Sequence, residues 1–169
     1  MTNLTQPLRE EHKELLPEIE ALRQVADQIG TAPLLTLREQ IDAAYDFLAH
    51  HLIPHAEAEE KALYPAVVKV MGAPEATATM SRDHVEVRRL TDELGLLRLK
   101  IGSAELTAAQ ANDLRRVLYG LYTLVKVHFA KEEEVYLPIL DLRLTPATAR
   151  DLFEKMEHAA HEAKEALAH

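Results

Sequence analysis

The chain has 169 residues, of which 47% are hydrophobic, and it carries a net charge of −9. This length and composition predict one globular domain over residues 1–169, exclude a disordered tail, and leave no basic stripe with which to bind nucleic acid. There is no cysteine, so disulfides, thiolate metal sites and iron–sulfur clusters are excluded and any metal must bind nitrogen and oxygen atoms.

The chain divides into five predicted helices. Gly30, Gly72 and Gly102 follow long periodic segments, where glycine commonly ends a helix in the left-handed conformation. Helix starts are predicted by two capping boxes, Thr36 with Glu39 and Thr107 with Gln110, and by Pro74 and Pro146 in first turns. The predicted helices span about 4–29, 36–71, 75–101, 107–141 and 146–167.

Three prolines fall inside the second and fourth predicted helices. Pro65 and Pro138 lie near the C-terminal part of each helix, where a kink or an early end is expected. Pro54 cannot donate to the carbonyl of His50, so we expect the backbone just before His55 to be bent.

The hydrophobic pattern is helical throughout and predicts an all-α fold. Apolar residues recur at helical spacing and form one predicted buried stripe in the fourth helix: Val117, Leu121, Leu124, Val125, Val135 and Ile139. No stretch approaches the length of an apolar membrane span, and residues 1–9 do not resemble a targeting segment. We therefore expect no membrane partner and a cytoplasmic location.

An internal repeat carries the functional signal. Residues 8–22 aligned with 80–94 place His12 over His84, each preceded by an acid, Glu11 or Asp83. Residues 55–65 aligned with 128–138 place His55 over His128, Glu59 over Glu132 and Glu60 over Glu133. Two helix pairs therefore occur in tandem, each with one histidine on its first helix and a histidine and a glutamate on its second.

The repeated residues predict a metal site. His55 with Glu59, and His128 with Glu132, are four residues apart and so project from one helix face. That face also carries Leu48, Ala62, Ala66, Leu121 and Val135, so we expect it to point inward. Four imidazoles and two carboxylates suit two borderline divalent ions with carboxylate bridges. The predicted ligands are His12, His55, Glu59, His84, His128 and Glu132.

Other candidate ligands have weaker support. His158 with Glu162 and His161 with Glu165 share the spacing but lack the repeat, so we expect them on a solvated face. His51 lies one turn before His55 and is an optional ligand or supporting residue. The five tyrosines are expected to pack, although a phenol near the metals could bond a bridging group.

The segments HAEAEEKALYP and HFAKEEEVYLP resemble the hemerythrin-like, or HHE cation-binding, family over about residues 8–140. The resemblance implies an up-down four-helix bundle with an additional C-terminal helix, and two non-haem iron ions joined by carboxylate and oxo or hydroxo bridges. It implies bridging by Glu59 and Glu132 and terminal ligation by the four histidines. Oxygen carriers of this family look to have a further histidine where this chain has Arg88, which puts reversible oxygen storage in doubt.

The favoured function is a di-iron module that binds or reacts with dioxygen, peroxide or nitric oxide as a sensor, scavenger or store. The alternatives are a peroxide-decomposing di-iron enzyme and a helical interaction module with a structural metal or none. A ferritin-like site is disfavoured because that motif places glutamate three residues before histidine. The fifth helix either caps the bundle or forms a dimer surface, so monomer and homodimer both stay open.

Overall fold

The computed structural model describes residues 3–167, so the ends of the predicted domain, 1–2 and 168–169, lie outside it. The described residues form helices and no strand, which confirms the all-α prediction. The elements are α1 (Gln6–Gln28), α2 (Leu34–Phe47), η1 (Leu48–Leu52), α3 (Ile53–Ala58), η2 (Glu59–Leu63), α4 (Tyr64–Met71), α5 (Ala78–Leu99), α6 (Ala108–Lys131), η3 (Glu132–Tyr136), α7 (Leu137–Arg143) and α8 (Pro146–Leu167). The η elements are π-helical.

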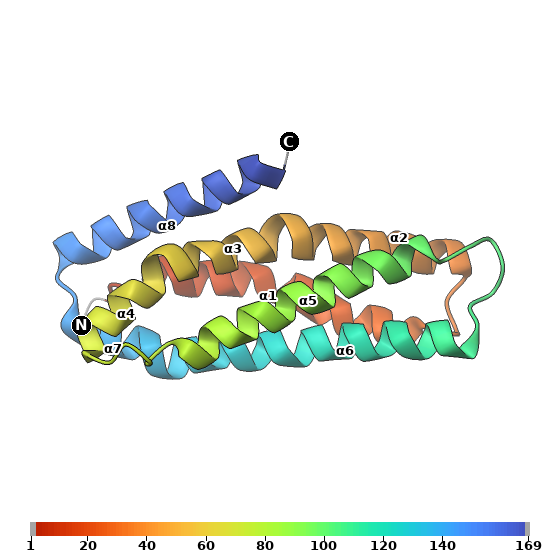
Figure 1. The fold of residues 1–169 in the computed structure, drawn as a ribbon, viewed down its shortest axis with the longest axis horizontal. Coiled ribbons are helices and arrows are strands. Elements are labelled where there is room, and N and C mark those ends of the chain that lie inside the picture. The colour runs from red at the N-terminus through yellow and green to blue at the C-terminus, as the bar shows by residue number, and fades with distance from the viewer. Residues whose placement is uncertain (1–2, 168–169) are drawn as a thin grey trace.

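Four long helices run side by side, and a fifth lies outside them (Figure 1). The second helix is the continuous run from α2 to α4, and the fourth is the run from α6 to α7. Around the bundle, α1 contacts α2 and α6, while α5 contacts α2, α3 and α6. The additional helix α8 packs on α3 and η2. The predicted helix number and order are therefore confirmed.

Several predicted helix ends are confirmed. Gly30 and Gly72 have positive φ angles of 86° and 66°, which glycine tolerates because it has no Cβ. Thr107 and Gln110 form the predicted capping box. Pro146 is the first residue of α8.

Three predicted helix ends were wrong. Thr36 does not cap α2, because the helix begins at Leu34 and the carbonyl of Pro33 accepts the first bond, from Leu37 N–H. Pro74 precedes α5 by a turn closed by bonds from Ala76 to Ala73 and from Ala78 to Glu75.

Gly102 does not end α5 in the left-handed conformation, since the positive-φ glycines of the described chain are Gly30 and Gly72. The helix stops at Leu99. Lys100 and Ile101 donate to the carbonyls of Leu97 and Arg98, so a tightened last turn satisfies these carbonyls without a left-handed residue.

The three prolines inside the second and fourth long helices each follow a π-helical segment by two residues. Each segment is closed by a bond spanning five residues: Ile53 to Leu48, Tyr64 to Glu59 and Leu137 to Glu132. Proline lacks an N–H, and its ring clashes with the carbonyl four residues earlier. A wider turn relieves that clash, so Pro54, Pro65 and Pro138 are accommodated by an extra residue and the helices continue beyond them.

The extra residue in η3 explains why Val135 was wrongly predicted to be buried. Val135 is 47% exposed, whereas Leu137 and Leu140 are fully buried. One additional residue rotates the following side chains by about 100° relative to an uninterrupted α-helix. The apolar stripe therefore changes phase at the π-helical segment.

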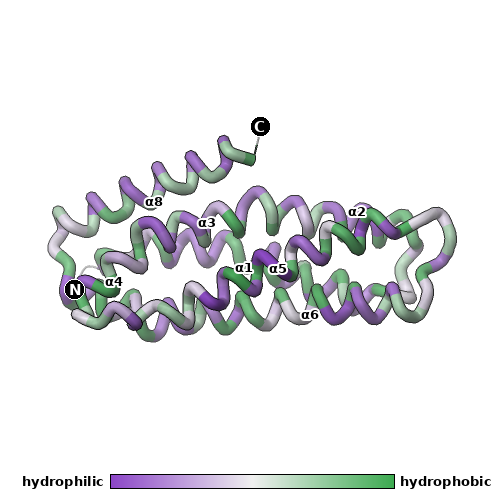
Figure 2. Tube along the Cα trace, viewed as in Figure 1, coloured by the Kyte–Doolittle hydropathy of each residue, from purple (hydrophilic) through white to green (hydrophobic). Residues whose placement is uncertain are grey.

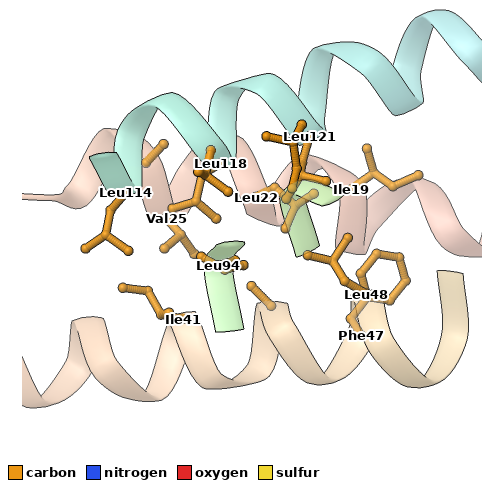
Figure 3. Close-up of a cluster of buried hydrophobic side chains, with 14 of the residues drawn as sticks. Ile19, Leu22, Val25, Ile41, Phe47, Leu48, Leu94, Leu114, Leu118 and Leu121 are labelled. Atoms are coloured by element: carbon orange, nitrogen blue, oxygen red, sulfur yellow. The ribbon is translucent and has the colours of Figure 1, made fainter. Parts of the chain in front are cut away.

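The hydrophobic core has two parts. One cluster includes Ile19, Leu48, Leu94 and Leu118 (Figure 3). The other lies toward the end of the bundle that α8 covers, and includes Leu8 and Leu63 together with Leu152 and Met156 of α8 (Figure 1). In each of the four long helices, the predicted ligands lie between residues of the first cluster and residues of the second.

Hydrophilic and hydrophobic residues alternate along every helix (Figure 2). This pattern is typical of helices that bury one face against their neighbours. Within residues 3–167, no helix has both the length and the hydropathy needed to cross a membrane.

We expect Leu118→Ala to lower the free energy of unfolding by about 2–5 kcal/mol, because it leaves a cavity at a fully buried position of the first cluster. Urea denaturation measures this loss. The control is Leu142→Ala, at a leucine that is 75% exposed, for which the expected change is within about 0.5 kcal/mol. Equal effects of the two substitutions would contradict the assigned core.

Candidate metal centre

The six predicted ligands come together inside the bundle. Glu59 and Glu132 have no exposed surface, and the side chains of His12, His55 and His128 are 3–4% exposed. The side chain of His84 is 11% exposed. The four long helices contribute, in order, His12 from the first, His55 and Glu59 from the second, His84 from the third, and His128 and Glu132 from the fourth.

Glu59 stands between two pairs of histidines. Its Oε1 lies 3.0 Å from His55 Nε2 and 3.7 Å from His12 Nε2. Its Oε2 lies 3.1 Å from His84 Nε2 and 3.9 Å from His128 Nε2. Two sets of ligand atoms, each within 4.8 Å of one another, therefore share this residue: His12, His55 and Glu59, and Glu59, His84 and His128. We call these pairs the His12–His55 half and the His84–His128 half.

Glu132 also reaches both halves. Its Oε2 lies 3.3 Å from His12 Nε2, and its Oε1 lies 3.4 Å from His128 Nε2. The phenol of Tyr64 donates to Glu132 Oε1 at 3.0 Å. The same oxygen of Tyr64 lies 3.3 Å from His84 Nε2 and 3.2 Å from His128 Nε2, so Tyr64 belongs to the His84–His128 half alone.

Each histidine is oriented by a carboxylate from the neighbouring helix. The Nδ1–H groups donate in a closed cycle round the bundle: His55 to Glu11 at 2.9 Å, His84 to Glu60 at 2.7 Å, His128 to Asp83 at 3.0 Å and His12 to Glu133 at 2.8 Å. These bonds turn every Nε2 toward the centre. Such outer carboxylates fix the tautomer and raise the basicity of a ligating imidazole.

Several inward-facing atoms make no hydrogen bond within the described chain. They are His12 Nε2, His55 Nε2, both carboxylate oxygens of Glu59, and Glu132 Oε2. Buried polar atoms are normally paired, and an unpaired buried carboxylate is costly. Cations between these atoms would satisfy them and balance the two buried charges, so the donor set fits metal binding.

In the metal-free protein, the neighbouring carboxylates raise the pKa values of His12, His55 and His128. Burial alone would lower the pKa of His12, but the nearby carboxylates of Glu132 and Glu59 outweigh this effect and raise the pKa to about 9. Burial also works against protonation of His128, but Glu132 and Glu59 again outweigh it and raise the pKa to about 10. Burial would raise the pKa of Glu59, yet the surrounding histidines, His55 first, hold it well below its usual range.

The phenol of Tyr64 stays protonated. Burial, followed by the charges of Glu59 and Glu132, raises its pKa well above the usual range for tyrosine. Tyr64 is therefore a hydrogen-bond donor at the centre.

The structure leaves other candidate residues outside the centre. His51 is exposed and stacks on Phe47. Arg88 is exposed and forms an ion pair with Glu57. His158 and His161 are 75% and 70% exposed and pair with glutamates of their own helix, which confirms the prediction of a solvated face.

The sequence prediction missed the role of Tyr64. In an uninterrupted α-helix, residues five apart do not share a face. The π-helical segment η2 brings Tyr64 onto the face of Glu59, and its signal in the sequence was Pro65, directly after Tyr64. The carboxylates that orient the histidines already stood out in the internal repeat, where Glu11 aligns with Asp83 and Glu60 with Glu133. Which histidine each of them contacts depends on how the helices pack, and the repeat does not contain that information.

Comparison with known proteins gives one informative match. The family model described as the hemerythrin HHE cation binding domain matches residues 3–140, most of the chain. The match ends before α8, so this helix lies outside the family domain. Searches of curated proteins and of solved structures gave no significant match.

The raised histidine pKa values predict how the stability of the metal-free protein depends on pH. Protonated His12 and His128 stabilise the fold fully below their unfolded pKa of 6.5, and this contribution is lost as pH rises through their folded pKa values of about 9 and about 10. We therefore expect the melting temperature of chelator-treated protein to decrease as the pH is raised from 6.5 to about 10.

The melting temperature is measured by circular dichroism across that pH range. A control variant, His158→Gln, changes an exposed histidine of α8 and should show the same fall. A melting temperature that stays constant or rises from pH 6.5 to 10 would contradict the arrangement of buried ion pairs.

Proposed function

The chain belongs to the hemerythrin HHE cation-binding family, and we propose that it holds two iron ions that bind or react with a small oxidant. The oxidant would be dioxygen, peroxide or nitric oxide, and the protein would serve as a sensor, scavenger or store. The observation that carries the proposal is the position of Glu59, each of whose oxygens faces a different pair of histidines.

This geometry supports two ions better than one. His12 and His55 would hold one ion, and His84 and His128 the other, while Glu59 and Glu132 would bridge them because each spans both halves. Imidazole and carboxylate donors are suitable ligands for iron. When bound, the ions supply the open coordination positions and the electrons for reaction with a small oxidant.

The chain would supply the surroundings of the ions. The outer carboxylates Glu11, Glu60, Asp83 and Glu133 hold the imidazole rings in place. The buried residues Leu48, Leu121 and Phe129 belong to the adjoining apolar cluster and exclude water from that end of the centre. Phe129 stacks on His12 with 4.1 Å between ring centroids.

The metal assignment is tested by the iron content of protein loaded anaerobically with ferrous iron and then desalted. We expect two irons per chain, and less than one in Glu59→Gln, because this substitution removes the shared charge with little change in volume. The control is Glu162→Gln. It removes the glutamate of a histidine–glutamate pair that has the same four-residue spacing but lies on the exposed face of α8, so this variant should retain two irons. Equal iron content in both variants would refute the site.

We expect Tyr64→Phe to retain both irons but to bind nitric oxide about fivefold more weakly, the value of one hydrogen bond of about 1 kcal/mol. The phenol would donate to a ligand in the His84–His128 half, as it now donates to Glu132. Titration of the ferrous protein with nitric oxide, followed by absorbance, measures the affinity. Tyr122→Phe, at a partly buried tyrosine packed against the first cluster, is the control and should bind as the natural chain does.

A further inference from the structure

Three surface grooves reach the surroundings of the metal centre. We name each groove after a helix on its rim. They are the α8 groove (Glu11, Ala58, Ala160), the α6 groove (His12, Leu16, Phe129) and the α5 groove (Ser81, His84, Val85).

None of the six ligand residues lines the α8 groove. The residue it shares with the metal surroundings is Glu11, whose carboxylate accepts a hydrogen bond from the Nδ1–H of His55. The His55 side chain behind it is 3% exposed. A ligand in this groove would contact the charged carboxylate of Glu11, and the imidazole of His55 behind it is buried.

The α6 groove reaches a ligand residue but is closed over it. Phe129 stacks almost parallel on His12, with 16° between the ring planes. Glu133 accepts from His12 Nδ1–H and is itself held by Arg9. His12 is left with 3% of its side chain exposed.

The α5 groove contains the most exposed ligand residue of the centre. His84 lines it with 11% of its side chain exposed, whereas the other five ligand residues are at most 4% exposed. The Nε2 of the same ring lies 3.1 Å from Glu59 Oε2 and 3.0 Å from His128 Nε2. One imidazole therefore separates solvent from the inward-facing atoms.

The walls of the α5 groove position His84 and leave space above it. Glu60 accepts from His84 Nδ1–H and from the hydroxyl of Ser81. Val85, the next residue on α5, is 53% exposed. Arg88 is paired with Glu57, and Arg89 with Glu86 and Glu93, so the charges of both arginines are already balanced.

We infer that the small ligand enters through the α5 groove, past Ser81 and Val85, and binds in the His84–His128 half beside the phenol of Tyr64. The paired arginines favour an uncharged ligand, such as nitric oxide, over an anion. The inference rests on the proposed function, because it names the entry route and the half of the same centre that takes the ligand.

The test places one tryptophan in each groove. The natural chain has no tryptophan, so each variant also carries a single fluorophore that reports folding. Val85→Trp fills the α5 groove, while Leu16→Trp and Ala160→Trp fill the α6 and α8 grooves as matched controls. Iron content is measured first, and the association rate of nitric oxide with the ferrous protein is then measured by stopped-flow absorbance.

We expect all three variants to hold the iron of the natural chain and Val85→Trp alone to bind nitric oxide at least about tenfold more slowly. An unchanged rate in Val85→Trp, or equal slowing in Leu16→Trp or Ala160→Trp, would overturn the entry route while leaving the iron site intact. Failure of the natural chain to hold iron would instead overturn the proposed function, and the first measurement detects it separately. A Val85→Trp chain that loses iron is replaced by Asp92→Trp, at another lining residue of the same groove, and is judged by the same criterion.

Discussion

Two carboxylates without solvent contact, Glu59 and Glu132, are the constraint around which the bundle is organised. Burying such charges is costly unless opposite charge and hydrogen bonds surround them, and every long helix contributes a histidine to that surrounding. The histidines are fixed in turn by carboxylates of neighbouring helices, in a cycle that runs from the first helix to the fourth and back. The centre therefore sets the relative position of all four helices.

Much of this centre could be predicted from the chain alone, because it depends on local spacing and on repetition. The four-residue spacing of His55 with Glu59 fixes a shared helix face whatever the tertiary structure is. The repeat then indicates that a second such face must meet the first. Capping and first-turn preferences are also local, and they marked the helix starts at Thr107 and Pro146 correctly, but the same signals at Thr36 and Pro74 were wrong.

The features that could not be predicted depend on interactions across the bundle or on a change of helical period. Val135 was misplaced because a constant period of 3.6 residues was assumed through η3. Tyr64 was left without a role because η2 carries it onto the ligand face. The pairing of Glu60 with His84 rather than with its own helix follows from which helices are neighbours, and spacing within one helix does not contain that information.

The prolines that follow the π-helical segments also fix the position of those segments along the helix. An extra residue in a helix can in principle migrate by exchanging one hydrogen bond for the next, which would shift the phase of every side chain it passes. If the wide turn moved away from Pro65 or Pro138, the proline ring would again meet the carbonyl four residues earlier, at a cost of about 3 kcal/mol. Each proline thus anchors the irregular turn at one place. With the two turns held in place, the side chains on either side of them keep their helical phase, and Glu59 and Glu132 stay aligned across the bundle.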